Sequence, residues 1–207
     1  KKNMLVPFSL KSIIERYKLL LTNREFILLI LSVSANFSAF FIYVLASPVF
    51  LIDHLGFTAQ QFGYLFIPTV TGMMIGSFIA KKTAGVVNSS LVLKFGYYFM
   101  FFISLANLLF CSFMPNNPFF NIGFIALYNI GMASAMPIIS LAALDCFPKI
   151  RGTAASGQAF MQMFFSSIVA GFLVPILWFS TFGLSLGLFF LISFGLVKIT
   201  KTNLWKI

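Results

Sequence analysis

The chain has 207 residues, of which 60% are hydrophobic and 9% are charged, and 14 lysines and arginines against four acidic residues give it a formal net charge of +10. A soluble domain carries roughly 25% charged residues, so this composition argues against an ordinary water-soluble fold. The basic residues lie only between or outside long apolar runs, which argues against a basic face for nucleic acid and indicates the lipid bilayer as the partner.

A charged leader precedes the first apolar run. Its apolar residues recur at helical spacing with charged residues between them, and they are Leu10, Ile13, Ile14, Tyr17, Leu20 and Leu21. A helix of this kind lies on a membrane surface or against a neighbouring bundle. We therefore interpret residues 1–24 as a cytoplasmic leader or linker, 25–199 as a transmembrane bundle and 200–207 as a cytoplasmic tail.

Charged residues divide the chain into four apolar blocks, two of which are long enough to cross a membrane twice. One crossing needs about 20 residues. The stretches MPNNP (114–118) and WFSTFG (178–183) supply turn residues in the middle of the two long blocks. The fold class is therefore predicted to be all-α, a polytopic membrane bundle of six transmembrane helices. The predicted helices are Phe26–Ile52, Gln60–Ala80, Phe95–Phe113, Phe119–Leu144, Gly152–Leu177 and Phe182–Lys198.

The orientation follows from the loops. Every lysine and arginine falls in the leader, in the tail or beside the loops after the second and fourth helices, whereas the other loops hold only Asp53 and His54. The positive-inside rule then predicts that both termini lie in the cytoplasm. The expected location is the cell inner membrane, as a multi-pass protein. His54 is expected to be a solvated loop residue. Cys111 and Cys146 are placed at opposite membrane faces, too far apart for a disulfide.

The stretch RGTAASGQAFMQMFFSSIVAG, residues 151–171, carries two glutamines one helical turn apart within the fifth predicted helix. Gln158 and Gln162 share a helix face with Ser166, whereas four large apolar residues form another face. These four are Phe160, Phe164, Ile168 and Phe172. An amide left unpaired in hydrocarbon costs several kcal/mol. We therefore expect the glutamine face to point into the bundle or into a cavity.

Polar faces of similar design recur on the first, second and fourth predicted helices, whereas the third and sixth carry few polar residues and are expected to be peripheral. Tyrosine, amide and methionine side chains together suit a cavity for a small, partly apolar solute. The alternative is that they only hydrogen-bond across a packed bundle. The predicted cavity residues are Asn36, Tyr43, Tyr64, Tyr128, Asn129, Met132, Met136, Gln158 and Gln162.

No ionisable residue falls in the middle of a predicted crossing, so the chain is not expected to couple transport to protons by itself. Asp145 and Arg151 flank one basic loop and form a candidate inner gate, with ordinary interfacial charges as the alternative. An intramembrane protease would need a serine beside a histidine, but Ser156 and His54 are predicted at opposite faces. We expect no enzyme activity, no metal site and no cofactor.

Two stretches resemble a known family. LASPVFLIDHLGFTAQQFGYLF, residues 45–66, resembles the seventh-to-eighth helix region of drug:proton antiporters of the major facilitator superfamily, in the bicyclomycin/chloramphenicol-resistance branch. FPKIRGTAASGQAFMQM, residues 147–163, resembles that branch's loop into the eleventh helix. The resemblance implies the C-terminal six-helix half of a major-facilitator fold, whose cavity is lined by the first, second, fourth and fifth helices of each half. KKTAGVVNSS, residues 81–90, departs from the Gly-Arg-rich turn usual in that family.

The resemblance also implies that the proton-coupling acid lies in a partner, an N-terminal six-helix half. The leading hypothesis is an efflux-type secondary transporter, or half of one, that moves small amphiphilic molecules outward by alternating access. The alternative is a non-transporting or degenerate membrane interaction domain.

Overall fold

The computed structural model describes residues 10–114 and 117–206, which form helices and connecting turns with no strand among them. Six helical segments are long and apolar enough to cross a membrane. The predicted six-helix, all-α membrane fold is therefore confirmed. These segments are Arg24–Leu45, Ala59–Thr83, Ser89–Phe113, Pro118–Asp145, Arg151–Leu177 and Thr181–Ile199.

Several crossings consist of more than one helical element. The α-helices are α1 (Leu10–Thr22), α2 (Arg24–Leu45), α3 (Gly63–Thr83), α4 (Ser89–Phe113), α5 (Pro118–Asp145), α6 (Arg151–Ile168), α7 (Val174–Leu177), α8 (Thr181–Ile199) and α9 (Asn203–Lys206). Two π-helical segments and one 3₁₀ turn complete the chain. They are η1 (Val49–His54), η3 (Val169–Leu173) and η2 (Ala59–Gln61).

Asparagine side chains start three of the crossings. Asn23, Asn88 and Asn117 each accept a hydrogen bond from backbone N–H groups in the first turn of α2, α4 and α5. Such a cap satisfies one of the donors that a helix start leaves open. Because Asn88 caps α4, that helix begins at Ser89, and the predicted start at Phe95 was too late.

The first predicted crossing, 26–52, is not one continuous helix. The α-helical part ends at Leu45, and the π-helical segment η1 follows Pro48. A second π-helical segment, η3, interrupts the fifth crossing just before Pro175. Proline has no backbone N–H to donate, so the helical hydrogen-bond register changes near it. Both irregular segments lie at the end of the bundle that holds Asp53.

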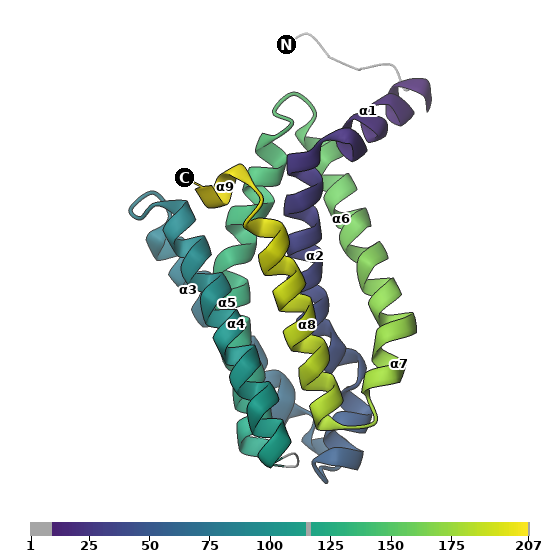
Figure 1. Ribbon diagram of the computed structural model, residues 1–207, viewed down its shortest axis with the longest axis vertical. Coiled ribbons are helices and arrows are strands. Elements are labelled where there is room, and N and C mark those ends of the chain that lie inside the picture. Colours follow the sequence, from purple (N-terminus) through teal and green to yellow (C-terminus); the bar gives the residue numbers. More distant parts are fainter. Residues whose placement is uncertain (1–9, 115–116, 207) are drawn as a thin grey trace.

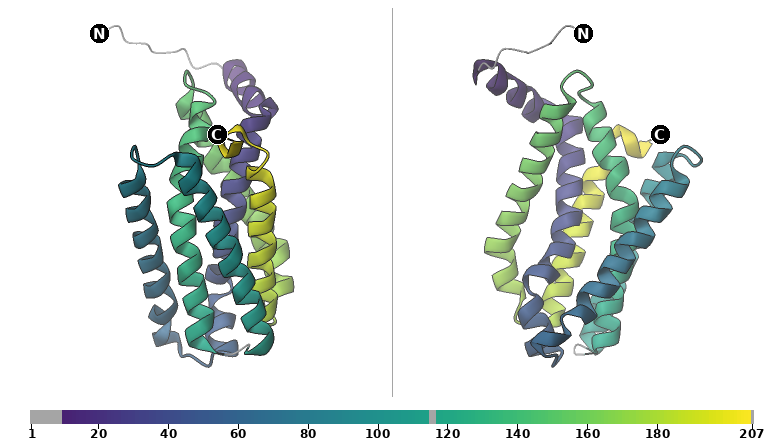
Figure 2. Two further views of the ribbon diagram at one scale, coloured as in Figure 1. Left: turned by 60° about the vertical axis from the view of Figure 1, so that its left-hand side comes forward. Right: turned by 180° about the vertical axis from the view of Figure 1, so that it is seen from behind.

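The helices form two layers (Figures 1 and 2). α4 and α8 make one layer, which lies toward the viewer in Figure 1. α3, α5, α2 and α6 spread across the other layer in that order, so that α3 and α6 lie at opposite edges. These four are the helices predicted to carry polar faces. They therefore share one layer, and α4 and α8 cover its back.

Small residues allow α3 and α5 to cross closely. A Cβ atom added at Gly72 or Gly76 would collide with the backbone carbonyl oxygen of Ala126 or Ile130 on α5. Only glycine permits this approach, which is the usual role of a G-x-x-x-G stretch in membrane helices. The α3–α5 contact is the most extensive between any two helices in the described part of the chain.

Both terminal helices lie at the same end of the bundle as the turns after α3 and α5 (Figure 1); we call this the basic end. α9, within the predicted tail, packs on the bundle. The Asn203 N–H donates to Glu25 Oε1 at 2.8 Å, and the Trp205 ring contacts Tyr97 and Tyr98. Residues 1–9 of the predicted leader, the side chains of residues 10–13, residues 115–116 of the MPNNP turn and residue 207 lie outside the described part.

Candidate functional site

The predicted cavity residues fall into two groups that the structure treats differently. Asn36, Tyr43, Tyr128, Asn129 and Met132 are almost completely buried, with exposed fractions of 3% or less. We call these five residues the closed core. Within this six-helix bundle they do not line an open surface, so contact with a solute stays a prediction for them.

The end of the closed core nearest Asp53 is held by a chain of polar contacts. Asn107 on α4 donates its amide Nδ2–H to the Tyr43 hydroxyl at 3.0 Å. One turn further along α4, the Cys111 thiol donates to Asn121 Oδ1 on α5 at 2.9 Å. The third predicted helix, α4, lies with α8 in the covering layer, and it also supplies the hydrogen-bond partner of Tyr43.

The middle of the closed core is less completely paired. The Tyr128 hydroxyl donates to the backbone carbonyl of Asn36 at 3.2 Å, and the Tyr97 hydroxyl lies beside the Asn36 side chain. Gly195 on α8 leaves room for this amide, since a Cβ there would lie 2.8 Å from Asn36 Oδ1. Among the described residues, the side-chain amides of Asn36 and Asn129 make no hydrogen bond of ordinary geometry. Each such group costs about 1–3 kcal/mol.

The second group lies between α5 and α6. Gln158 donates its amide Nε2–H to the Ser140 hydroxyl of α5 at 2.8 Å. Met136 and Gln162 are half-buried nearby on the same helix faces, and the Gln162 amide makes no side-chain hydrogen bond in the described part of the chain. We call Met136, Ser140, Gln158 and Gln162 the α5–α6 seam. The expected inward direction of the glutamine face is confirmed at Gln158 by its bond to α5.

α6 is attached to the bundle mainly through α2 and only lightly through α5. Ser38 on α2 and Ser166 on α6 share a hydrogen bond of 2.8 Å between their buried hydroxyls. The four large apolar residues of the other face, Phe160, Phe164 and Ile168 of α6 and Phe172 of η3, are exposed instead, from 45% at Ile168 to 72% at Phe172. A helix in a membrane can expose such a face to lipid or to another helical domain.

Two aromatic residues of α2 escaped the sequence reasoning. Phe37 and Phe41 stack with ring centroids 5.3 Å apart and remain half-buried. Helical geometry places them on a different face of α2 from Asn36 and Tyr43. Neither residue is polar, so neither belongs to a polar stripe, but their spacing of one helical turn is visible in the sequence.

Tyr64 stands apart from the other predicted residues. Its side chain is 59% exposed and stacks on Phe57 with ring centroids 5.6 Å apart, at the end of the bundle opposite the basic end. A groove of about 420 Å³ adjoins it, and the residues lining the groove are Phe57, Tyr64, Pro68, Pro118, Phe119, Ile122 and Gly123. Because Gln158 lies near the basic end, Tyr64 is not brought together with the glutamines.

The candidate inner gate is a pair of charges that do meet. Arg151 Nη2 donates to Asp145 Oδ1 across the turn between α5 and α6, and both side chains are more than half exposed. Exposed ion pairs stabilise proteins by only about 0–1 kcal/mol. The pair therefore links the two helices weakly at the basic end, and the Gln158–Ser140 bond links them again further along α6.

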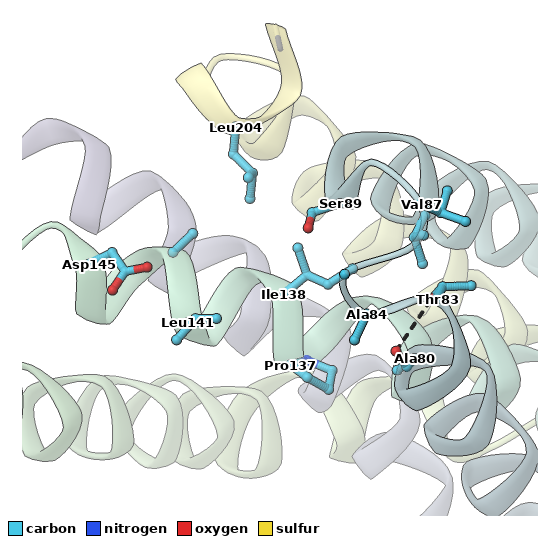
Figure 3. Close-up of a pocket in the computed structure, with 13 residues that line it drawn as sticks. Ala80, Thr83, Ala84, Val87, Ser89, Pro137, Ile138, Leu141, Asp145 and Leu204 are labelled. Atoms are coloured by element: carbon cyan, nitrogen blue, oxygen red, sulfur yellow. Dashed lines mark hydrogen bonds between the residues drawn. The ribbon is translucent and has the colours of Figure 1, made fainter.

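A second groove opens at the basic end between α3, α4 and α5 (Figure 3). It has a volume of about 350 Å³ and is lined mostly by small and apolar side chains, with Pro137 and Leu141 on its floor, Leu204 of α9 above and Asp145 at one end. The sequence offered no signal for it, because alanines and valines at these positions are typical of any packed membrane helix.

The only histidine of the chain does more than face solvent. Its Nε2 atom lies 2.7 Å from the backbone carbonyl of Trp178, at hydrogen-bonding distance. His54 is partly buried, so the expectation of a simply solvated loop residue is wrong. The bond joins the end of η1 to the end of α7. Among the described residues, no three His, Cys, Asp or Glu side chains gather as a metal site would require.

Comparison with known proteins gives one distant similarity. The chain is 30% identical over 77 residues to multidrug resistance protein MdtM of Escherichia coli O157:H7, a match that covers 37% of this chain and 19% of that protein. No protein-family profile and no solved structure matches the chain. Six membrane-length helices and this similarity together indicate a multi-pass membrane protein of transporter type.

Proposed function

We propose that this chain is the C-terminal six-helix half of a major-facilitator drug:proton antiporter of the bicyclomycin/chloramphenicol-resistance type. It exports small amphiphilic molecules across the cell inner membrane by alternating access, and it has no enzymatic role. An N-terminal six-helix half completes the cavity and supplies the proton-coupling acid. Both termini of the chain lie in the cytoplasm.

The observation that carries this proposal is the α5–α6 seam. Polar amides lie between two membrane helices that pack lightly, and the Gln162 amide is left without a partner in the described bundle. A packed bundle would use such groups as hydrogen-bond glue. A half-exposed polar group beside a flexible methionine instead suits a binding site that accepts solutes of different shapes.

The uneven burial of the helices supports a missing partner half. In the crossings formed by α3 and by α6 with α7, only 22% and 17% of the most apolar stretch is buried inside the bundle. In α2 the buried share is 72%. These weakly buried crossings sit at the two edges of one layer (Figure 2). A second helical half laid across this layer would cover both edges and enclose the seam.

Within this proposal the named residues have separate tasks. Gln158, Gln162 and Met136 contact the solute in the seam, Tyr64 contacts it at the opposite end of the bundle, and the Asp145–Arg151 pair closes the basic end. The closed core locks α2 and α5 onto α4 and α8. The Asn36 and Asn129 amides, which make no hydrogen bond of ordinary geometry among the described residues, would meet new partners if these helices shift.

Co-expression with the N-terminal half of a related transporter tests the proposal, with ethidium efflux from cells as the readout. Gln162→Leu should lower the export rate about tenfold, because losing one polar contact of ~1.4 kcal/mol changes binding tenfold. Phe164→Leu, two residues away on the exposed apolar face, is the matched control and should export normally. Equal rates for the two variants at equal protein levels would contradict the proposal.

A non-transporting membrane interaction domain is the second candidate. The closed core favours it, because five predicted cavity residues are sealed inside the bundle and need no solute to explain them. Under this alternative the chain stays folded and six-helical without any partner half, and ethidium does not change its unfolding temperature.

A further inference from the structure

Two of the apolar residues of α1, Tyr17 and Leu20, hold this helix against α6. The Tyr17 hydroxyl shares a hydrogen bond of 3.1 Å with the Ser156 hydroxyl, and Leu20 is only 1% exposed. Leu20 Cδ1 lies 2.9 Å from the position that a Cβ on Gly157 would occupy, so the glycine makes the close contact possible. α1 is therefore fixed to the basic end of α6.

Two other apolar residues of α1, Ile14 and Leu21, are exposed and form an uncovered strip on the helix. Ile14 and Leu21 are 67% and 58% exposed, although helical spacing puts them next to Tyr17 on one side of α1. Together with Lys18 and Thr22 these residues line a shallow groove on the helix. An apolar strip bordered by a lysine is typical of helices that lie in a membrane interface.

The charge beside this strip is basic. Lys18 lines it and Arg24 follows it in the chain, whereas helical spacing puts Arg16 on the opposite side of α1, and Glu15 and Glu25 are acidic. Each basic residue near an anionic lipid surface contributes about 1 kcal/mol of attraction. The uncovered strip thus has both the apolar and the electrostatic character that anionic phospholipids would match.

The position of α1 puts the strip at the right depth. Asn23 alone separates α1 from α2, and α2, which is long and apolar enough to cross a membrane, begins at Arg24. Leu21 therefore lies within a few residues of the point where the chain meets the lipid headgroups. α1 also leaves the bundle at an oblique angle and does not continue along α2 (Figure 2).

We propose that α1 binds anionic phospholipids of the adjoining leaflet through Ile14, Lys18 and Leu21, while Tyr17 and Leu20 hold the basic end of α6. One side of α1 thus binds the membrane surface and the other side packs on α6, which belongs to the least buried crossing. The charge of the leaflet then restrains the helix that carries Gln158 and Gln162. This inference goes beyond transport and does not depend on the presence of a partner half.

The full chain in lipid nanodiscs provides the test. Bimane is attached at Ile14→Cys in a background of Cys111→Ala and Cys146→Ala, and at Leu19→Cys as the matched control. Leu19 is also exposed, at 52%, but helical geometry directs it away from the Ile14 and Leu21 side. We expect spin-labelled lipid to quench the label at position 14 several-fold more than the label at 19. The contrast should grow as phosphatidylglycerol replaces phosphatidylcholine and should shrink in high salt or with Lys18→Gln.

Equal quenching at positions 14 and 19 would overturn the proposal, and so would quenching at 14 that ignores lipid charge. Protection of the position-14 label from aqueous iodide without lipid quenching would assign the strip to a protein partner and also overturn it. Amide hydrogen exchange on the unsubstituted chain is the second measurement if the cysteine replacements unfold the bundle. Slower exchange in α1 with phosphatidylglycerol is expected, and unchanged exchange contradicts the proposal.

Discussion

The closed core and the α5–α6 seam contain the same kinds of side chain, yet only one of them is shut. In the closed core, α4 and α8 lie behind α2 and α5 and bury their polar groups completely. In the seam no helix of the described residues lies behind α6 on the side away from α2, and Gln162 keeps partial exposure. The comparison shows that the number of helices around a polar group matters more than its chemistry. This number decides whether the group is buried in packing or stays exposed to a solute.

The largest expected effect comes from closing a tight helix contact. Gly76→Ala puts a Cβ against the Ile130 carbonyl and 2.9 Å from the Ala133 Cβ, so α3 must move off α5. Overpacking of this kind costs about 1–3 kcal/mol. Thermal unfolding in detergent should show a lower midpoint temperature for Gly76→Ala. Gly171→Ala, whose new Cβ has no atom of another helix within 4 Å, should leave the midpoint unchanged. Equal midpoints would mean that α3 is not packed as described.

Next comes the polar contact of the closed core. Asn107→Leu leaves the buried Tyr43 hydroxyl without its amide partner, which should cost about 1–2 kcal/mol of unfolding free energy. Leu109→Ala on the exposed side of α4 is the control and should cost less. Asn107→Leu should not change which solutes a reconstituted transporter exports. A change in solute selectivity would place Tyr43 in the transport route and break the comparison.

A smaller effect is expected in the seam. Gln158→Leu, Ser140→Ala and the double variant form a cycle that isolates the bond between α5 and α6. Interhelical hydrogen bonds in membranes average about 0.6 kcal/mol, and the coupling energy should be of that size. Reversible unfolding in mixed micelles measures it. A coupling energy as large as the Asn107 effect would show that the seam is sealed like the core.

The smallest effect belongs to the exposed ion pair. Arg151→Gln should lower the unfolding free energy by only about 0.2–0.5 kcal/mol, because water and salt screen a pair at the surface. Export by the two-half transporter should respond more strongly if the pair closes the basic end. The charge-reversed double variant, Asp145→Arg with Arg151→Asp, should then restore export. No rescue by that reversal would leave the two residues as ordinary interfacial charges.

The crossings could be predicted because hydrocarbon imposes a simple rule on length and polarity. Apolar blocks, turn residues and loop charges were enough to place all six helices, and the inward turn of Gln158 followed from the cost of an amide in lipid. Boundaries were less secure where a single side chain decides them, as Asn88 does by capping α4. The π-helical turn after Pro48 was likewise invisible in a pattern of hydrophobicity.

The sorting of polar residues into two groups could not be predicted. A stripe on one helix shows which residues share a face, but it does not show which helix stands opposite. α4 was therefore judged peripheral, although its Asn107 is the partner of Tyr43. His54 was assigned to solvent because its partner, the Trp178 carbonyl, lies 124 positions away in the sequence. Such contacts depend on the packing of the whole bundle.

Cysteine accessibility tests the central claim, an open seam beside a closed core, most directly. Gln162→Cys and Asn36→Cys are compared in membranes, in a background without Cys111 and Cys146, for their rate of reaction with a charged methanethiosulfonate reagent. We predict rapid reaction at position 162 and almost none at position 36, and an exported solute should slow only the reaction at position 162. Equal rates at the two positions, or faster reaction at position 36, would contradict it.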